Sequence, residues 1–197
     1  MSAELKRLRR RPLLLPIAVA LLIALAAASG IYWSQSNART TVVVLVRHGE
    51  PAAGESGDPD LSRAGEQRAA GLGAYLDEVL AGRVVDHIYA ADTRRSQQTA
   101  APVANQFRLP VNLLAASDWE DLPSRIRRQH RGETVVVVGY AGTLPEVIRT
   151  LSAIDVAIEP EEYDALFIVA LPSPGEARLF KLRYGPASPG KPAAQAP

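Results

Sequence analysis

The sequence predicts an α/β fold of three layers, a mostly parallel central sheet with helices on both faces and an antiparallel C-terminal edge hairpin. Two valine-rich runs, at residues 40–46 and 134–139, are β-branched and too short for buried helices, so we interpret them as central strands. Segments with helical periodicity alternate with strands, which is typical of parallel sheets covered on both faces. Two apolar runs that flank residues 172–175 (PSPG) predict the hairpin.

Local signals place the other elements in order. Ser62 is expected to cap a helix whose apolar face includes Leu72 and Leu76. Pro102 is expected to interrupt a second helix early, whereas Pro145 falls in the first turn of a later helix, where proline is tolerated. The remaining expected elements are a strand at 86–90, helices at 93–107, 122–130 and 144–152, and strands at 165–171 and 177–184.

The N-terminal segment predicts export. Residues 13–33 carry no charge over 21 positions, about the length that a helix needs to cross a hydrocarbon core of about 30 Å. We expect residues 1–12 to be a basic cytoplasmic N-terminus and residues 13–33 a transmembrane helix or signal-anchor, with Tyr32 and Trp33 at the outer boundary. The domain would then lie outside the cytoplasm, in the periplasm or the cell exterior.

A cleaved signal peptide is the alternative, because residues 26–29 offer small side chains after an apolar run, and the domain would then be secreted. We expect residues 34–40 to be a linker and residues 41–184 to be the folded domain. Residues 185–197 lack the apolar side chains that ordering requires, so we expect a disordered tail.

Composition excludes several classes of function. The formal net charge is +1, but five basic residues against Glu4 give the first 36 residues +4, which leaves −3 for the rest. Nucleic-acid binding needs a clustered basic face, so no nucleic-acid partner is expected. The chain has no cysteine, which excludes disulfides and thiolate sites, and nothing in it predicts a metal or a cofactor. The sequence makes no prediction of oligomeric state.

The residues that can act on a ligand follow the ends of the predicted strands. Ligands of such sheets bind beyond the carboxyl ends of the strands, so these residues should converge. A neutral imidazole at His48 can attack phosphorus, and the guanidiniums of Arg47 and Arg95 can bind phosphoryl oxygens. Gly49 would let the backbone approach a ligand closely. The alternative is that Arg47 and His48 are only a polar cap on a strand.

Four ordered motifs carry a family resemblance. Residues 47–50 (RHGE) resemble the RHG(E) signature of the histidine phosphatase superfamily, also called the phosphoglycerate mutase-like family. Residues 61–65 (LSRAG) resemble its L-[ST]-x-x-G helix start, and residues 95–100 (RSQQTA) its R-A-x-[EQ]-T-A helix. Residues 138–143 (VGYAGT) resemble its V-[GS]-H-x-x-[TV] strand end. The resemblance covers residues 41–184 and implies the phosphoglycerate mutase-like fold.

The resemblance also assigns roles. It implies that His48 is the phosphorylated nucleophile and that Arg47 and Arg95 bind the phosphoryl group. The backbone N–H groups of Ala141 and Thr143 would complete a clamp for the oxyanion. The chain is then a phosphomonoesterase that acts on a small phosphorylated substrate through a phosphohistidine intermediate.

One position departs from the family pattern, because Tyr140 stands where the family has a second histidine. A phenol can donate one hydrogen bond but cannot supply the positive charge of an imidazolium, and such a loss costs about 10²- to 10³-fold in rate. Three interpretations stay open: a weakened phosphatase, a reorganised site, or a catalytically impaired pseudophosphatase that binds phosphorylated or anionic ligands at the membrane.

The general acid and two further histidines complete the set of candidates. Asp118 and Glu120 precede a predicted helix in a segment that resembles the D-x-x-D-L stretch of exported family members, and either can protonate a leaving group. The alternative is that Asp118 or Asp121 caps that helix. We interpret His87 and His130 as structural or solvated, because no cluster of ligands is evident around them in the sequence.

Overall fold

The computed structural model describes residues 14–36, 39–54 and 57–188. The chain divides into two compact units, Met1–Ala38 and Arg39–Pro197, which are described separately. In the first unit, helix α1 spans Leu14–Ser36 and so continues into the expected linker. The basic residues predicted to be cytoplasmic lie outside the described residues.

The helical prediction for residues 13–33 agrees with α1, but its membrane-spanning role is not supported. Among the residues that the structure describes, no helix combines the length and the apolar character that crossing a membrane requires.

The second unit is built on a sheet of six strands in the order β3-β2-β4-β1-β5-β6. The strands are β1 Arg39–Arg47, β2 His87–Ala91, β3 Val111–Leu114, β4 Thr134–Gly139, β5 Ala165–Ser173 and β6 Arg178–Arg183. Strands β1, β4, β2 and β3 run parallel, whereas β5 pairs antiparallel with β1 and with β6. The predicted fold class, a mostly parallel sheet with an antiparallel C-terminal hairpin, is confirmed.

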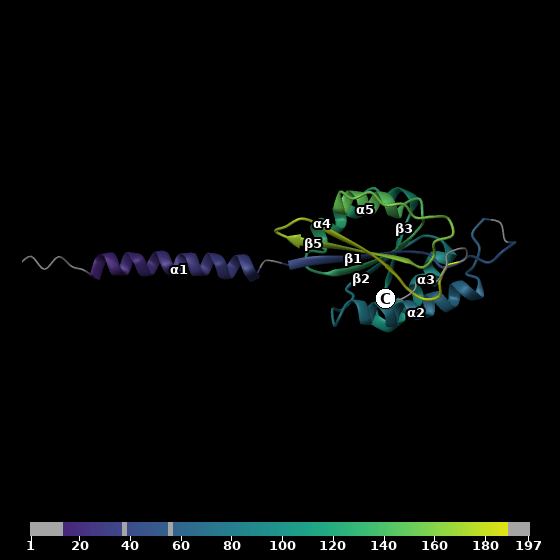
Figure 1. Cartoon of the computed structure of the whole chain (residues 1–197), viewed down its shortest axis with the longest axis horizontal. Helices are drawn as coiled ribbons and strands as arrows, with labels where there is room; N and C mark the ends of the chain where they lie inside the picture. The colour runs from purple at the N-terminus through teal and green to yellow at the C-terminus, as the bar shows by residue number, and fades with distance from the viewer. Residues whose placement is uncertain (1–13, 37–38, 55–56, 189–197) are drawn as a thin grey trace, which may run out of the picture. The chain divides into compact units, whose positions relative to one another are not determined.

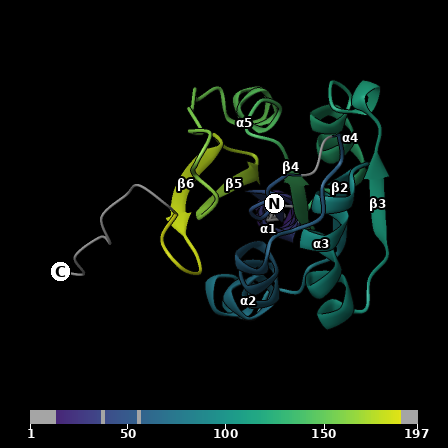
Figure 2. The same ribbon diagram turned by 90° about the vertical axis from the view of Figure 1, so that its right-hand side faces the viewer.

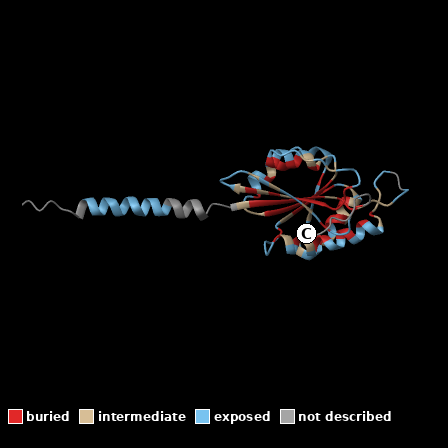
Figure 3. Ribbon diagram, viewed as in Figure 1, coloured by how far each residue is buried: buried red, intermediate tan, exposed pale blue. Residues whose placement is uncertain are grey.

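Helices cover both faces of this sheet. Helices α2 (Arg63–Val79) and α3 (Arg94–Phe107) lie on one face, and α4 (Leu122–Gln129) and α5 (Leu144–Ser152) on the other, as Figures 1 and 2 show. A short 3₁₀ turn, Ala116–Asp118, leads into α4. The strands are therefore the middle layer of three, and the central strands β1, β2 and β4 are buried along most of their length (Figure 3).

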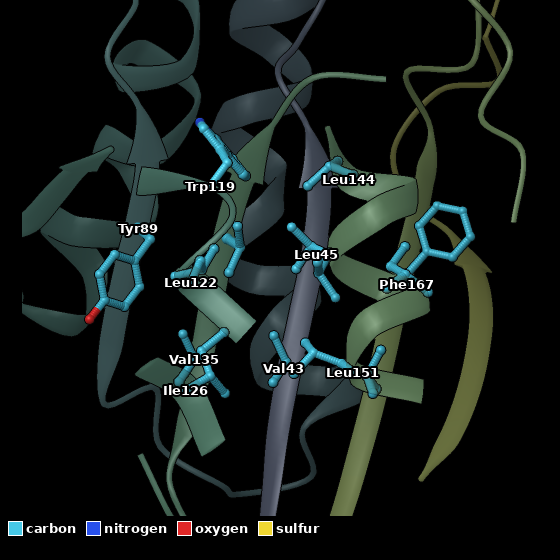
Figure 4. Close-up of a cluster of buried hydrophobic side chains, with 14 of the residues drawn as sticks. Val43, Leu45, Tyr89, Trp119, Leu122, Ile126, Val135, Leu144, Leu151 and Phe167 are labelled. Atoms are coloured by element: carbon cyan, nitrogen blue, oxygen red, sulfur yellow. The ribbon is translucent and has the colours of Figure 1, made fainter. Parts of the chain in front are cut away.

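The valine runs are explained by burial on both faces. Along β1, Val43 and Leu45 point into the core under α4 and α5, whereas Val42 and Val44 point into the core under α2 and α3. Figure 4 shows the first of these cores, with Trp119 among its side chains. A strand buried on both faces needs continuous apolar residues rather than an alternating pattern.

Three local predictions differ from the structure. Strand β3 was not predicted, because only Leu114 of its four residues is buried and the apolar signal is weak. Helix α3 runs through Pro102 without interruption. Proline removes one backbone hydrogen bond, but the next two residues, Val103 and Ala104, are buried in the core and hold the helix in place.

The third difference concerns the start of the expected disordered tail. The side chain of Ser188 is buried and accepts hydrogen bonds from the N–H groups of Tyr163 and Asp164, both at 2.9 Å, while donating to Asp164 Oδ1 at 2.6 Å. Residues 185–188 are thus part of the domain. Residues 189–197 lie outside the described residues.

Candidate active site

The predicted convergence of strand ends is seen around His48. Its N–H donates to Gly139 O at 3.0 Å, which extends the β1–β4 ladder by one residue and places His48 beside the end of β4. The next residue of that segment, Tyr140, has its ring 5.8 Å from the imidazole, edge to face. Arg95, in the first turn of α3, has Nε 3.3 Å from His48 Nε2. Three separate elements therefore meet at one imidazole.

The imidazole of His48 is held in one orientation. Its Nδ1 lies 2.8 Å from Gly49 O, and because a carbonyl only accepts, Nδ1 carries the proton and Nε2 keeps its lone pair. Burial, together with the charges of Arg47 and Arg95 and against the opposing effects of the Gly49 carbonyl and Glu50, lowers the pKa of His48 to about 4. At neutral pH, His48 is an uncharged imidazole whose unprotonated Nε2 accepts a hydrogen bond from Arg95 Nε.

Arg95 is positioned by an acidic loop residue. Its Nη1 donates to Asp58 Oδ1 at 3.3 Å, and its Cζ lies 5.3 Å from the centre of the Tyr140 ring. Asp58 also accepts from the backbone N–H of Arg94 at 2.8 Å, so one carboxylate fixes both the start of α3 and the guanidinium. Asp58 lies in a Gly/Pro/Asp-rich loop without periodicity, and the sequence analysis did not identify it.

Arg47 adds positive charge at His48 but has most of its donors engaged elsewhere. Nη1 donates to the carbonyls of Glu159, at 3.3 Å, and Pro160, and Nη2 donates to Tyr163 Oη at 3.3 Å. The guanidinium also stacks 4.0 Å from the centre of the Tyr163 ring. Burial lowers the pKa of Arg47, and its Nε is buried without a hydrogen-bond partner among the described residues. Because a guanidinium has five N–H groups, these bonds leave the buried Nε and one N–H of Nη2 without an assigned acceptor.

The hydroxyl of Tyr140 is turned to the start of α3. It donates to Thr93 Oγ1 at 3.1 Å, and Thr93 donates in turn to Ser96 Oγ at 3.1 Å. The ring is half-buried between His48 and Trp119, whose ring centre lies 6.4 Å away. In this arrangement the phenol forms a wall of the site rather than a second phosphate donor.

The backbone donors predicted for ligand binding are only partly available. The N–H of Gly49 donates to Thr99 Oγ1 at 2.9 Å, and the N–H of Thr143 donates to Tyr140 O at 3.1 Å. Glycine at position 49 is needed by the fold, because a Cβ there would lie 2.9 Å from Gly65 O of α2. Within the described part of the chain, the N–H of Ala141 has no hydrogen-bond partner. Of these three, the Ala141 donor remains for a phosphoryl oxygen.

The acid candidates differ in their surroundings. Asp118 Oδ2 accepts from the N–H of Ala115 at 3.0 Å, so its carboxylate closes the 3₁₀ turn. Glu120 is exposed, and Asp121 does not cap α4 with its side chain. Glu50 pairs with Arg68 at 2.6 Å; burial raises the pKa of Glu50, but the hydrogen bonds and charge of Arg68, with the charge of Arg47, together lower it. The identity of the general acid stays a prediction for Asp118 and Glu120.

The expectation that His87 and His130 stand apart from other ligands is wrong. Their rings lie 4.1 Å apart, centre to centre, and Glu133 contacts both. Strand pairing creates this contact, since β2 and β4 align His87 with Val135. Deriving the register between the two predicted strands would have revealed this contact between His87 and Glu133.

Part of the chain resembles a known protein family. Residues 43–118 match the family model described as "Histidine phosphatase superfamily (branch 1)". No curated protein sequence matches the chain.

Solved structures of low identity share the fold. The protein histidine phosphatase SixA complexed with tungstate is 15% identical with a TM-score of 0.59, over 72% of this chain and 96% of that one. A mycobacterial glucosyl-3-phosphoglycerate phosphatase is 16% identical with a TM-score of 0.56, over 75% and 100%. Phosphoglycerate mutase from Plasmodium falciparum is 18% identical with a TM-score of 0.55, over 81% and 98%.

Proposed function

We propose that this chain, whose family-model match and fold both point to the histidine phosphatase superfamily, is a phosphomonoesterase that acts through a phosphohistidine at His48. The observation that carries the proposal is the neutral, oriented imidazole, whose unprotonated Nε2 accepts a hydrogen bond from Arg95 Nε at 3.3 Å. A residue that serves only as a cap on a strand has no need of a lone pair directed at a cation.

The first half-reaction forms the covalent intermediate. His48 Nε2 attacks phosphorus, the bond from phosphorus to the ester oxygen breaks, and the leaving oxygen takes a proton from the general acid, for which Asp118 and Glu120 are the candidates. The guanidinium charges of Arg95 and Arg47 balance the negative charge on the phosphoryl oxygens.

The second half-reaction restores the enzyme. Water attacks the phosphorus of phosphohistidine, the bond from phosphorus to Nε2 breaks, and inorganic phosphate leaves. The carboxylate that gave its proton in the first step now takes one from water. Because Nδ1 keeps its hydrogen bond to Gly49 O, the imidazole returns to the same tautomer after each cycle.

Tyr140 is the reason to expect slow turnover. Its hydroxyl is committed to Thr93, and a phenol brings no charge at neutral pH, so the site works with one cationic donor fewer than the family pattern. The same observation supports the alternative function, a pseudophosphatase that binds phosphorylated or anionic ligands without turnover.

Hydrolysis of an aryl phosphate by the full-length chain separates these functions. We expect slow turnover by the parent, loss of it in His48→Ala, and a gain of up to about 10²-fold in Tyr140→His. A silent parent with an active Tyr140→His variant would support the pseudophosphatase. Absence of turnover in all three proteins would contradict a catalytic role for this site.

We further propose that the domain acts outside the cytoplasm. The support is the order of a basic cluster followed by an uncharged apolar run at residues 13–33. A β-lactamase fused to the C-terminus should confer resistance only if it is exported, and deletion of residues 1–36 should abolish that resistance. Equal resistance with and without these residues would contradict the proposal.

A further inference from the structure

A second group of ionisable side chains lies at the opposite edge of the sheet from His48. His87 begins β2, His130 caps the C-terminus of α4, and Glu133 immediately precedes β4. Because these strands are parallel, their amino ends lie at the edge away from the candidate active site. We refer to these three residues as the histidine cluster.

The ligand atoms of the histidine cluster have the spacing of a metal site. Glu133 Oε2 lies 3.2 Å from His87 Nε2 and 2.9 Å from His130 Nδ1, and all three ligand atoms lie within 4.8 Å of one another. Two ligands at about 2.0–2.1 Å from a tetrahedral zinc ion lie roughly 3.3 Å apart. The cluster therefore needs only small side-chain movements to surround an ion.

A further contact orients His130 for such a role. Its Nε2 lies 2.9 Å from the hydroxyl of Tyr89, a mostly buried residue whose oxygen points away from the other labelled side chains in Figure 4. Histidines that bind metals usually donate their other ring N–H to an oxygen, which leaves the first nitrogen unprotonated for the ion. Without an ion, Nδ1–H donates to the Glu133 carboxylate at 2.9 Å and Nε2 accepts from the Tyr89 hydroxyl. When an ion binds, the proton moves to Nε2, which then donates to the Tyr89 oxygen and leaves the lone pair of Nδ1 for the ion.

The histidine cluster has one buried ligand and two ligands that solvent can reach. The side chain of His130 is 6% exposed, whereas those of His87 and Glu133 are each 38% exposed, so an ion can enter from solvent and a water molecule can complete its coordination. Two imidazoles and one carboxylate suit zinc and neighbouring divalent ions better than magnesium or calcium, which prefer oxygen ligands.

We propose that His87 Nε2, His130 Nδ1 and Glu133 Oε2 bind one divalent ion of the zinc class, with water as the fourth ligand. The ion would join the start of β2, the end of α4 and the segment before β4. Its contribution is to the stability of this edge of the domain, so the proposal is independent of the chemistry at His48.

Zinc titration of the full-length, untagged chain after EDTA treatment tests the proposal by calorimetry. We expect one zinc ion per chain and a rise in melting temperature on binding. His87→Ala and Glu133→Gln, both at half-exposed positions, should weaken binding by more than about tenfold. Tyr89→Phe should weaken it by about 10- to 100-fold, because it removes the oxygen that orients His130.

His48→Ala is the matched control, because His48 is the one histidine of the chain's three that lies outside the cluster. It should bind zinc as the parent does. Absence of stoichiometric binding would overturn the proposal and leave the cluster as a set of hydrogen bonds. Binding that persists in His87→Ala and Glu133→Gln, or that disappears in His48→Ala, would overturn it as well.

Discussion

At the scale of single residues, a small number of groups fix the orientation and the charge of the His48 imidazole. One carbonyl fixes its tautomer, and burial together with two guanidiniums keeps it uncharged. Tyr140 completes the wall without adding charge. Two predictions follow at this scale, one from the protonation state of His48 and one from Arg95, the cation at its Nε2.

The pH dependence should report the lowered pKa of His48. Burial disfavours the imidazolium, so the nucleophile stays neutral down to a pKa of about 4, and kcat/KM corrected for substrate ionisation should fall only as the pH falls through that value. The unfolded chain takes up the proton near pH 6.5, so stability should decline as the pH falls from about 6.5 toward 4. A histidine signal that titrates near pH 6.5 by NMR, and is missing in His48→Ala, would contradict this assignment.

Arg95 offers a prediction with a control at the next position. Arg95→Ala removes the guanidinium at 3.3 Å from Nε2 and should lower kcat by about 10²- to 10³-fold. The side chain of Arg94 is 59% exposed and pairs with Asp60, so Arg94→Ala should retain most of the activity. Similar losses in both variants, measured as kcat on an aryl phosphate, would argue against a specific role for Arg95.

At the scale of elements, the site is built by the close approach of the β1 end and the start of α2. Gly49 and Gly65 lie against each other, and a Cβ on Gly65 would lie 2.4 Å from Glu50 O. The hydroxyl of Thr99 on α3 holds the same segment through the N–H of Gly49. The turn that carries His48 is therefore fixed by two helices.

Two glycines of α2 give opposite predictions. Gly65→Ala forces the backbone of residues 49–50 to move and should destabilise the fold by about 1–3 kcal/mol while lowering kcat. Gly71→Ala places a methyl group in open space in the same helix and should stabilise the fold by about 0.5–1 kcal/mol. Chemical denaturation of both variants checks this, and equal effects would show that the contact with Glu50 is unimportant.

Sequence patterns anticipated the elements better than the contacts between them. The valine strands and the residues after them could be placed because burial on both faces of a parallel sheet leaves a continuous apolar run. Asp58 and Tyr163 were missed because both lie in segments without periodicity and reach the site only through tertiary packing. The histidine cluster was missed for a related reason, since strand register rather than sequence distance brings His87 to Glu133.

At the scale of the whole domain, Arg68 connects the active-site turn to the C-terminal segment. It donates to Glu50 and to the carbonyls of Tyr184 and Pro186, at 3.1 and 2.8 Å, and its side chain is only 2% exposed. Residues 185–188 are held in this way against the turn that carries His48. The C-terminal segment of the domain thus stabilises the turn that follows β1.

Loss of this ion pair should affect folding more than loss of a surface pair. Glu50→Gln leaves a buried guanidinium unpaired and should destabilise the fold by about 3 kcal/mol. Because the folded-state pKa of Glu50 is lowered, this contribution is present above its unfolded pKa and is lost as the pH falls. Glu146→Gln, which breaks a solvent-exposed pair with Arg149, is the control and should leave the denaturation midpoint nearly unchanged.

The central claim is that His48 carries the phosphoryl group, and trapping the intermediate tests it most directly. The full-length Tyr140→His variant, mixed with an aryl phosphate and quenched in alkali, should yield a peptide with one phosphoryl group on His48 by mass spectrometry. The same peptide from parent protein should be labelled more slowly. Turnover without any phosphoryl group on His48 would contradict the claim, because hydrolysis would then proceed without the covalent intermediate.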